Sequence, residues 1–227
     1  MQTLLLMGFE PFDQDPVNPS WEAVRQLDGM LLGEDVQIVA RRLPCAFSLV
    51  GECLAEWITQ LRPSMVIATG LGPGRSSISM ERVAINVNDA RIPDNLGEQP
   101  VDTPVVIDGP VAYFSTLPIK AMVKALREAG VPAAVSQTAG TFVCNQVFYL
   151  LQHALAGTDV RSGFIHVPNL PEQVVGTGLA SMPLVTTLEG LRLAVQVAWN
   201  TQVDVVQAGG QVSCCLLYTS PSPRDVE

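Results

Sequence analysis

Two patterns of apolar residues alternate along the chain. Short continuous apolar runs predict buried strands, at residues 3–7, 36–43, 65–69, 78–87, 133–137 and 162–167. Stretches in which apolar residues recur every three or four positions predict helices, at residues 19–29, 46–61, 118–129, 142–156 and 187–200. This alternation is typical of an α/β fold, and because the sequence contains no internal repeat or linker, we expect one doubly wound domain.

Two local signals refine this pattern. Asn18 followed by Pro19 supplies a cap and a first-turn proline for the first helix. Residues 91–104 form a long polar loop with three prolines. Loops of this length are usually functional or lie over a neighbour, so we expect one of these roles here.

The segment after Gly210 differs from the rest of the chain. It reads QVSCCLLYTSPSPRDVE, with adjacent cysteines, two prolines and no clear periodicity. Such a sequence is typical either of translated cloning or sequencing-adaptor DNA or of a disordered natural tail. We therefore expect the folded domain to span residues 1–210 and leave 211–227 out of the functional argument.

Composition and charge narrow the classes of partner. Hydrophobic residues make up 48% of the 227 residues and charged residues 15%, which predicts a folded chain. A net charge of −9 gives no electrostatic help to a nucleic-acid or anionic-membrane partner. No apolar run approaches the ~18 residues of a membrane span, and the start lacks the basic region of a signal peptide. Five scattered cysteines predict reduced thiols, so we expect a soluble, cytoplasmic protein.

Metal and nucleotide cofactors are not expected. The chain holds two histidines, His153 and His166, and has neither a Cys-x-x-Cys nor a His-Glu-x-x-His motif for a metal. The glycine run at 70–74 follows a strand, as a dinucleotide loop would. However, Arg75 occupies the position of the third glycine and a strand pattern follows instead of a helix, so the fingerprint fails.

Cys144 is the candidate nucleophile among the cysteines. It follows a predicted strand and a glycine turn and lies in the first turn of a predicted helix. Unpaired N–H groups and the helix dipole favour a thiolate there and can also receive an oxyanion. Its setting alone leaves a nucleophile and a buried structural thiol equally open. Cys45 and Cys53 are expected to be packed side chains, with Cys53 in the core.

A cysteine nucleophile needs a base and a group that orients it. His166 ends a predicted strand, and because open α/β sheets form sites at the carboxyl ends of strands, we expect it near Cys144. His153 lies about 13 Å along the helix from Cys144 and is expected to cap that helix. Glu81 lies among apolar strand residues, where a carboxylate needs a partner. Orientation of a base and a structural ion pair with Arg82 both remain open for it.

Five motifs in order resemble one known family. They are GFEPF, GRSSISMERVAIN, NDARIPDN, SQTAGTFVCN and GFIHVPNLPEQ, and the resemblance covers about residues 1–210. The sequence resembles the pyrrolidone-carboxyl peptidases, the pyroglutamyl peptidase I family of cysteine peptidases. The resemblance implies removal of N-terminal pyroglutamyl residues from peptides without a cofactor. It also implies a twisted, mostly parallel sheet between two layers of helices, assembled as a homotetramer in the cytoplasm.

The resemblance also implies roles for single residues. By motif, Cys144 corresponds to the nucleophile of the family, His166 to its histidine and Glu81 to its glutamate. Phe9 and Phe12 of GFEPF correspond to the phenylalanines that border the lactam ring. These assignments agree with the setting of each residue, although the setting of Glu81 left two roles open.

Further along, the resemblance is less complete. Arg91 of the NDARIPDN motif corresponds to a position near the active site, with an oxyanion or supporting role. Some bacterial members carry a glutamine in the glycine-rich loop where this chain has Leu71. If that glutamine reads the substrate, a chain with Leu71 must leave the reading to backbone groups.

Two other functions fit parts of the same pattern. A cysteine amidase acting on another small amide is one alternative, because a change at Leu71 could redirect specificity. A ligand-binding protein without catalysis on the same scaffold is the other. The presence of Cys144, His166 and Glu81 together argues against the second alternative, because a retired site need not keep all three.

Overall fold

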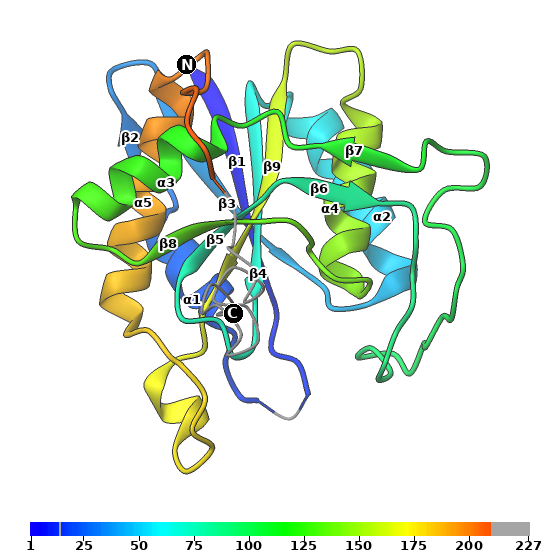
Figure 1. The fold of residues 1–227 in the computed structure, drawn as a ribbon. Coiled ribbons are helices and arrows are strands. Elements are labelled where there is room, and N and C mark those ends of the chain that lie inside the picture. Colours follow the sequence, from blue (N-terminus) through cyan, green and yellow to red (C-terminus); the bar gives the residue numbers. More distant parts are fainter. Residues whose placement is uncertain (14, 210–227) are drawn as a thin grey trace, which may run out of the picture.

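The computed structural model describes residues 1–13 and 15–209, and the predicted tail at 211–227 lies outside them. A seven-stranded sheet in the order β2-β3-β1-β4-β9-β5-β8 runs through the centre (Figure 1). Its strands are β1 (Gln2–Phe9), β2 (Leu31–Leu32), β3 (Val36–Leu43), β4 (Met65–Leu71), β5 (Ile78–Glu81), β8 (Ala133–Ser136) and β9 (Arg161–Val167). Strands β3, β1, β4 and β9 are parallel, whereas β5 is antiparallel to β9 and parallel to β8.

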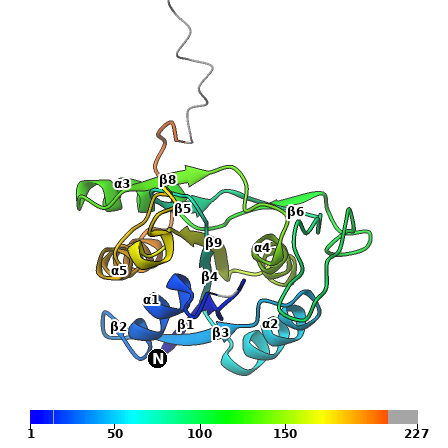
Figure 2. The ribbon, with the colours of Figure 1, turned by 90° about the horizontal axis from the view of Figure 1, so that it is seen from below.

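Helices cover both faces of this sheet (Figure 2). One layer holds α1 (Pro19–Val24), α3 (Ile119–Glu128) and α5 (Leu184–Asn200), and the other holds α2 (Phe47–Leu61) and α4 (Val143–Ala154). Strand β1 serves both layers, because Leu4 and Leu6 pack on the α1 and α5 side while Leu5 and Met7 pack on the α2 and α4 side. A continuous apolar run is thus buried on both faces, as in parallel sheets generally. The three-layer α/β fold is confirmed.

Caps fix the starts of two helices. Asn18 accepts a hydrogen bond from the backbone N–H of Ser20 at 3.1 Å, and Pro19 opens α1, as the sequence predicts. Helix α2 receives its cap from a distant residue, because Asp94 Oδ2 accepts from the backbone N–H of Phe47 at 2.7 Å. This bond ties the predicted loop at 91–104 to the start of α2.

The strand predicted at 78–87 is two strands in two sheets. Strand β5 ends at Glu81, and β6 (Val83–Ile85) leaves the central sheet to pair antiparallel with β7 (Ala112–Phe114). The break was not visible in the sequence because the partner of β6 is three residues long and comes about 30 residues later. In the described residues, no helix is long and apolar enough to cross a membrane.

Candidate active site

A cavity of about 590 Å³ opens where β1, β4 and β9 end and α4 begins. Six of the seven site residues expected from the sequence line it: Phe9, Phe12, Leu71, Arg91, Cys144 and His166. The seventh, Glu81, lies behind the wall and is fully buried. The structure therefore brings all seven to one region, although they come from segments spread over about 160 residues.

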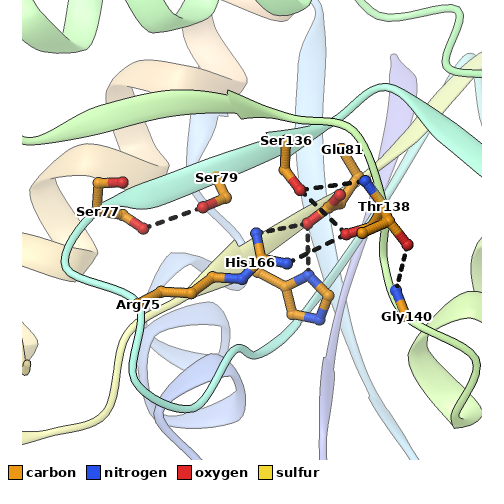
Figure 3. Close-up of polar contacts among 8 residues, drawn as sticks. All are labelled: Arg75, Ser77, Ser79, Glu81, Ser136, Thr138, Gly140 and His166. Carbon is orange, nitrogen blue, oxygen red and sulfur yellow. Dashed lines mark hydrogen bonds and ion pairs between the residues drawn. The ribbon is translucent and has the colours of Figure 1, made fainter. Parts of the chain in front are cut away.

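Glu81 and His166 form a buried pair at the junction of β5 and β9. Ser79 on β5 lies opposite His166 on β9, which carries the imidazole toward the end of β5. Glu81 Oε1 lies 2.8 Å from Nδ1 of His166 (Figure 3). A carboxylate at Nδ1 holds the ring proton on that nitrogen and leaves Nε2 as the acceptor.

The cationic partner of Glu81 is Arg75, so the alternative of an ion pair with Arg82 is wrong. Arg75 Nη1 lies 2.8 Å from Glu81 Oε1, and its Nη2 donates to the carbonyl oxygen of Thr138 at 3.2 Å (Figure 3). Arg82 instead donates from Nη2 to the carbonyl oxygen of Gly209 at 3.1 Å. Successive residues along an extended chain point to opposite sides, so Arg82 does not share the side of its neighbour.

Cys144 and His166 are both adjacent to Gly70 of β4. It is the second residue of α4, and a methyl group on Gly70 would lie only 2.9 Å from its Sγ. Gly70 in turn is paired in register with His166 on β9. The sulfur therefore lies over Gly70, where there is room for it only because glycine has no side chain. This position is one strand away from the imidazole of His166.

The reason that Cys144 and His166 meet differs from the one expected. Strand β8, which leads to Cys144, runs antiparallel to β9, so the carboxyl ends of these strands do not share one edge of a parallel sheet. The two regions meet because β5 and β8 lie across β4 and β9 (Figure 1), and α4 then begins over Gly70. The rule that sites form at the carboxyl ends of parallel strands therefore predicted correctly that Cys144 and His166 are neighbours, although β8 and β9 are not parallel.

The pKa of the Cys144 thiol is shifted in the direction opposite to that expected from its position at the start of a helix. Burial raises the pKa of the Cys144 thiol to about 12, the charge of Glu81 acts in the same direction, and Arg75 opposes both. Burial lowers the pKa of His166, and the bond to Glu81 opposes that shift. A helix dipole contributes typically about 0.3–1 kcal/mol, too little to offset removal of a thiolate from water. Both shifts favour a neutral thiol and a neutral imidazole over a thiolate–imidazolium pair.

The remaining described cysteines differ from each other. Cys45 is buried in the wall of the same cavity, and this burial raises the pKa of its thiol. Cys53 is half-exposed, so its expected place in the core is wrong. Helix α2 buries Phe47, Val50 and Leu54, and Cys53 lies at the edge of that face.

His153 lies in the last turn of α4 and is exposed. Its Nδ1 forms a 2.8 Å hydrogen bond with the hydroxyl of Tyr113, and its ring stacks on Tyr149 with centroids 6.1 Å apart. The side chain therefore holds β7 against α4 rather than capping the helix. His153 is not among the described residues that line the cavity.

Comparison with known proteins identifies the family. A family model described as pyroglutamyl peptidase matches residues 2–201. The chain belongs to the pyroglutamyl peptidase family. This membership confirms the resemblance seen in the motifs and makes the chain a cysteine-type hydrolase.

Other members of the pyroglutamyl peptidase family are similar to this chain in both sequence and structure. The pyrrolidone-carboxylate peptidase of Pseudomonas fluorescens is 75% identical over 213 residues, which cover 94% of this chain and all of the relative. The crystal structure of pyroglutamyl peptidase I from Bacillus amyloliquefaciens matches with a TM-score of 0.88 and 42% identity, over 91% of this chain and 99% of that one. A mutant pyrrolidone carboxyl peptidase from Pyrococcus furiosus matches with a TM-score of 0.85 and 43% identity, over 88% and 99%.

Two residues of the site were missed by reasoning from the sequence. Phe142 lines the cavity between two other rings, with centroids 5.2 Å from Phe12 and 5.2 Å from Phe47. Arg75 is the second. Both lie inside quoted motifs of the pyroglutamyl peptidase family, two residues before Cys144 and six before Glu81, so the motifs carried the signal and only the roles were not recognised.

Proposed function

We propose that the chain removes N-terminal pyroglutamyl residues from peptides through an acyl-enzyme on Cys144. His166 acts as base and then as acid, and Glu81 orients it. The observation that carries the proposal is the 2.8 Å bond between Glu81 and Nδ1 of His166, in the wall of a cavity that Cys144 also lines. A nucleophile, a base and an orienting carboxylate are the three parts that covalent acyl transfer requires.

The acylation step starts from the neutral thiol and the neutral imidazole that burial favours. Nε2 of His166 takes the thiol proton as Sγ of Cys144 attacks the carbonyl carbon of the pyroglutamyl residue. Glu81 stabilises the imidazolium that forms, because the pair is buried and the carboxylate lies at Nδ1. The imidazolium then protonates the amine of the departing peptide, which leaves a thioester on Cys144.

Deacylation reverses these proton transfers. A water molecule attacks the thioester carbonyl while His166 accepts its proton, and the proton returns to the sulfur as pyroglutamate leaves. In both steps the oxyanion is received at the start of α4. In the described part of the chain no side chain caps this helix at Phe142, so its first N–H groups can serve. Arg91, exposed at the mouth of the cavity, supports the same charge or the peptide carbonyl beyond it.

The cavity suits a neutral five-membered lactam. Pyroglutamate lacks the ammonium group that other aminopeptidases bind, so an apolar wall is compatible with it. Phe9, Phe12 and Phe142 supply aromatic surface, and Leu71 adds an apolar side chain at the end of β4. The polar edge of the lactam is then left to backbone groups of the surrounding loops.

Comparison of two chromogenic substrates tests the proposal. We expect p-nitroaniline to be released from the pyroglutamyl derivative, and kcat/KM for the prolyl derivative to be at least about 100-fold lower, because its charged amine has no partner in the aromatic part of the cavity. Equal rates on the two substrates would contradict the proposal. Rapid hydrolysis of unrelated small amides would favour the amidase alternative, and no turnover at all would favour a binding protein.

Assembly as a homotetramer is part of the proposal. It is supported by the family resemblance and by exposed apolar side chains in residues 96–114, the segment that ends with β7. These side chains are Leu96, Val101, Ile107, Val111 and Phe114. Light scattering at micromolar concentration should give the mass of four chains, and a monomer would contradict this part.

A cytoplasmic location is also proposed. Cys45, Cys53 and Cys144 carry free thiols, which is typical of a reducing compartment. Fractionation of cells that produce the protein should recover the activity with cytoplasmic markers, and recovery in a secreted fraction would contradict the proposal.

A further inference from the structure

Asn145, the residue after the nucleophile, is fully buried and is hydrogen-bonded through both the oxygen and the nitrogen of its side-chain amide. Its Oδ1 accepts a hydrogen bond from the backbone N–H of Ile85 at 3.0 Å. Its Nδ2 donates to the carbonyl oxygen of Ile85 at 2.9 Å and to that of Val87 at 3.0 Å. Three bonds therefore join the first turn of α4 to one short stretch of backbone.

This stretch of backbone is the edge of β6 that faces away from β7. Ile85 is paired with Ala112 of β7 in the two-stranded sheet. On the opposite edge the amide of Asn145 both accepts from and donates to Ile85, as a neighbouring strand would. A planar amide with these bonds fixes both distance and orientation, which an apolar contact would not do.

The same stretch is continuous with Glu81. Only Arg82 separates the end of β5 from β6, and its backbone N–H donates to the carbonyl oxygen of Ser136 at 2.9 Å, which holds the junction in place. Covalent and hydrogen-bonded links thus form a circuit from Cys144 through Asn145 and β6 to Glu81, and from Glu81 to His166. The amide of Asn145 is the link of this circuit that joins the nucleophile to the other two groups.

We propose that Asn145 is a positioning residue that sets Cys144 at its reacting distance and angle from the Glu81–His166 pair. The proposal rests on the proposed function, because it assigns the geometry of that reaction. The hydrogen bonds of the Asn145 amide go to backbone atoms of Ile85 and Val87, so its effect on the reaction passes through Cys144 and β6. Since a misplacement of about 1 Å can cost 100-fold in rate, loss of this link should lower turnover more than substrate binding.

Gln152 offers a matched control on the same helix. It is also a buried amide of α4, and its Nε2 donates to the carbonyl oxygen of Ser162 at 2.8 Å. Ser162 lies near the start of β9, whereas His166 lies near its carboxyl end. This bond therefore holds α4 against the sheet away from the site. A general loss of packing in α4 should appear in both variants, whereas loss of positioning should appear in one.

The experiment compares Asn145→Ala with Gln152→Ala in the full chain. Three quantities are measured: kcat and KM on a pyroglutamyl amide, melting temperature, and the rate at which iodoacetamide alkylates Cys144, followed by peptide mass spectrometry. For Asn145→Ala we expect kcat to fall about 10- to 100-fold with KM within about 3-fold, and alkylation at pH 7 to slow because His166 no longer assists loss of the thiol proton. For Gln152→Ala we expect kcat within about 2-fold at a similar loss of melting temperature.

Asn145→Ser tests the same idea with a smaller perturbation, because its hydroxyl keeps a polar group that can bond through a water molecule to the Ile85 backbone, and its kcat should lie between those of Asn145→Ala and Gln152→Ala. A folded Asn145→Ala with kcat and alkylation rate close to those of Gln152→Ala would overturn the proposal. Failure of both Asn145 variants to fold while Gln152→Ala folds would also overturn it, in favour of a purely structural role. An inactive parent chain would instead refute the proposed function.

Discussion

His166 and His153 each form a 2.8 Å contact between Nδ1 and a side-chain oxygen, in two regions that α4 connects. Near the start of the helix, His166 of β9 is 4% exposed and bonded to the carboxylate of Glu81. At the end of the helix, His153 is exposed and bonded to the hydroxyl of Tyr113. The two bonds have the same length, so length alone does not distinguish a candidate base from a structural histidine.

Three other properties separate the regions. The partner of His166 is a carboxylate, which stabilises an imidazolium, whereas a phenol does so only weakly. His166 is buried, which lowers its pKa and keeps the ring neutral and ready to accept a proton. Cys144 lies one strand away from His166, and His153 is packed against two tyrosines. Function therefore follows from the partner, the burial and the neighbours of the ring rather than from the length of its hydrogen bond.

The largest effect is expected for the nucleophile. Cys144→Ala and Cys144→Ser should each lower kcat at least about 10⁴-fold with an unchanged far-ultraviolet circular dichroism spectrum, because the first removes the sulfur and the second offers a poorly ionised hydroxyl. The measurement is release of p-nitroaniline from the pyroglutamyl derivative. If Cys144→Ala keeps more than a few per cent of activity, covalent catalysis at this residue is excluded.

The two histidines should then separate clearly. His166→Ala should lower kcat about 10³- to 10⁴-fold, because it removes the group that moves the proton in both steps. His153→Ala, its control, should remain within about 3-fold of the parent and lose only the bond to Tyr113. Inactivity of a normally folded His153→Ala would reverse the assignment of the base.

Arg75 should tune the buried pair without taking part in the reaction. Its charge lowers the pKa of His166, so Arg75→Gln should move the acid limb of the profile of kcat/KM against pH to higher pH. We expect turnover at pH 7 to fall about 3- to 30-fold, because Glu81 also loses its ion pair. Arg82→Gln is the matched control, and a shift of equal size there would contradict the assignment.

The smallest effect is expected at Leu71, which lines the cavity with an apolar side chain that cannot transfer a proton. Leu71→Ala should raise KM about 3- to 10-fold through lost apolar contact and leave kcat within about 2-fold. Steady-state kinetics on the pyroglutamyl amide measure both constants. An equal fall in kcat would instead place Leu71 among the groups that act in the transition state.

Much of the fold was readable from the sequence because its signals are local. The strand predicted at 36–43 coincides with β3, and the helix predicted at 46–61 begins one residue later as α2. Buried strands and amphipathic helices each leave a period that does not depend on distant partners. The short strands β2 and β7 leave no such period, because two or three residues are too few to show one.

The site was readable only in part, for a different physical reason. Setting and motif together pointed to Cys144, His166 and Glu81, and the structure brings them together. The ion pair between Arg75 and Glu81, however, depends on the path of a loop, and a neighbour in sequence was the wrong partner. The protonation state of the thiol depends on how much water the folded chain removes, which no local pattern encodes.

The profile of kcat and kcat/KM against pH for Glu81→Gln tests most directly whether Glu81 acts on His166. Because burial favours a neutral resting pair, the imidazolium forms during the reaction and needs the carboxylate. We therefore expect kcat to fall about 10²- to 10³-fold, below the ~10⁴ known for the corresponding change in a serine triad. Glu81 raises the pKa of His166, so the acid limb should also move to lower pH, opposite to the shift in Arg75→Gln. A folded Glu81→Gln with a near-normal rate and an unmoved acid limb would contradict the account and return Glu81 to a structural role.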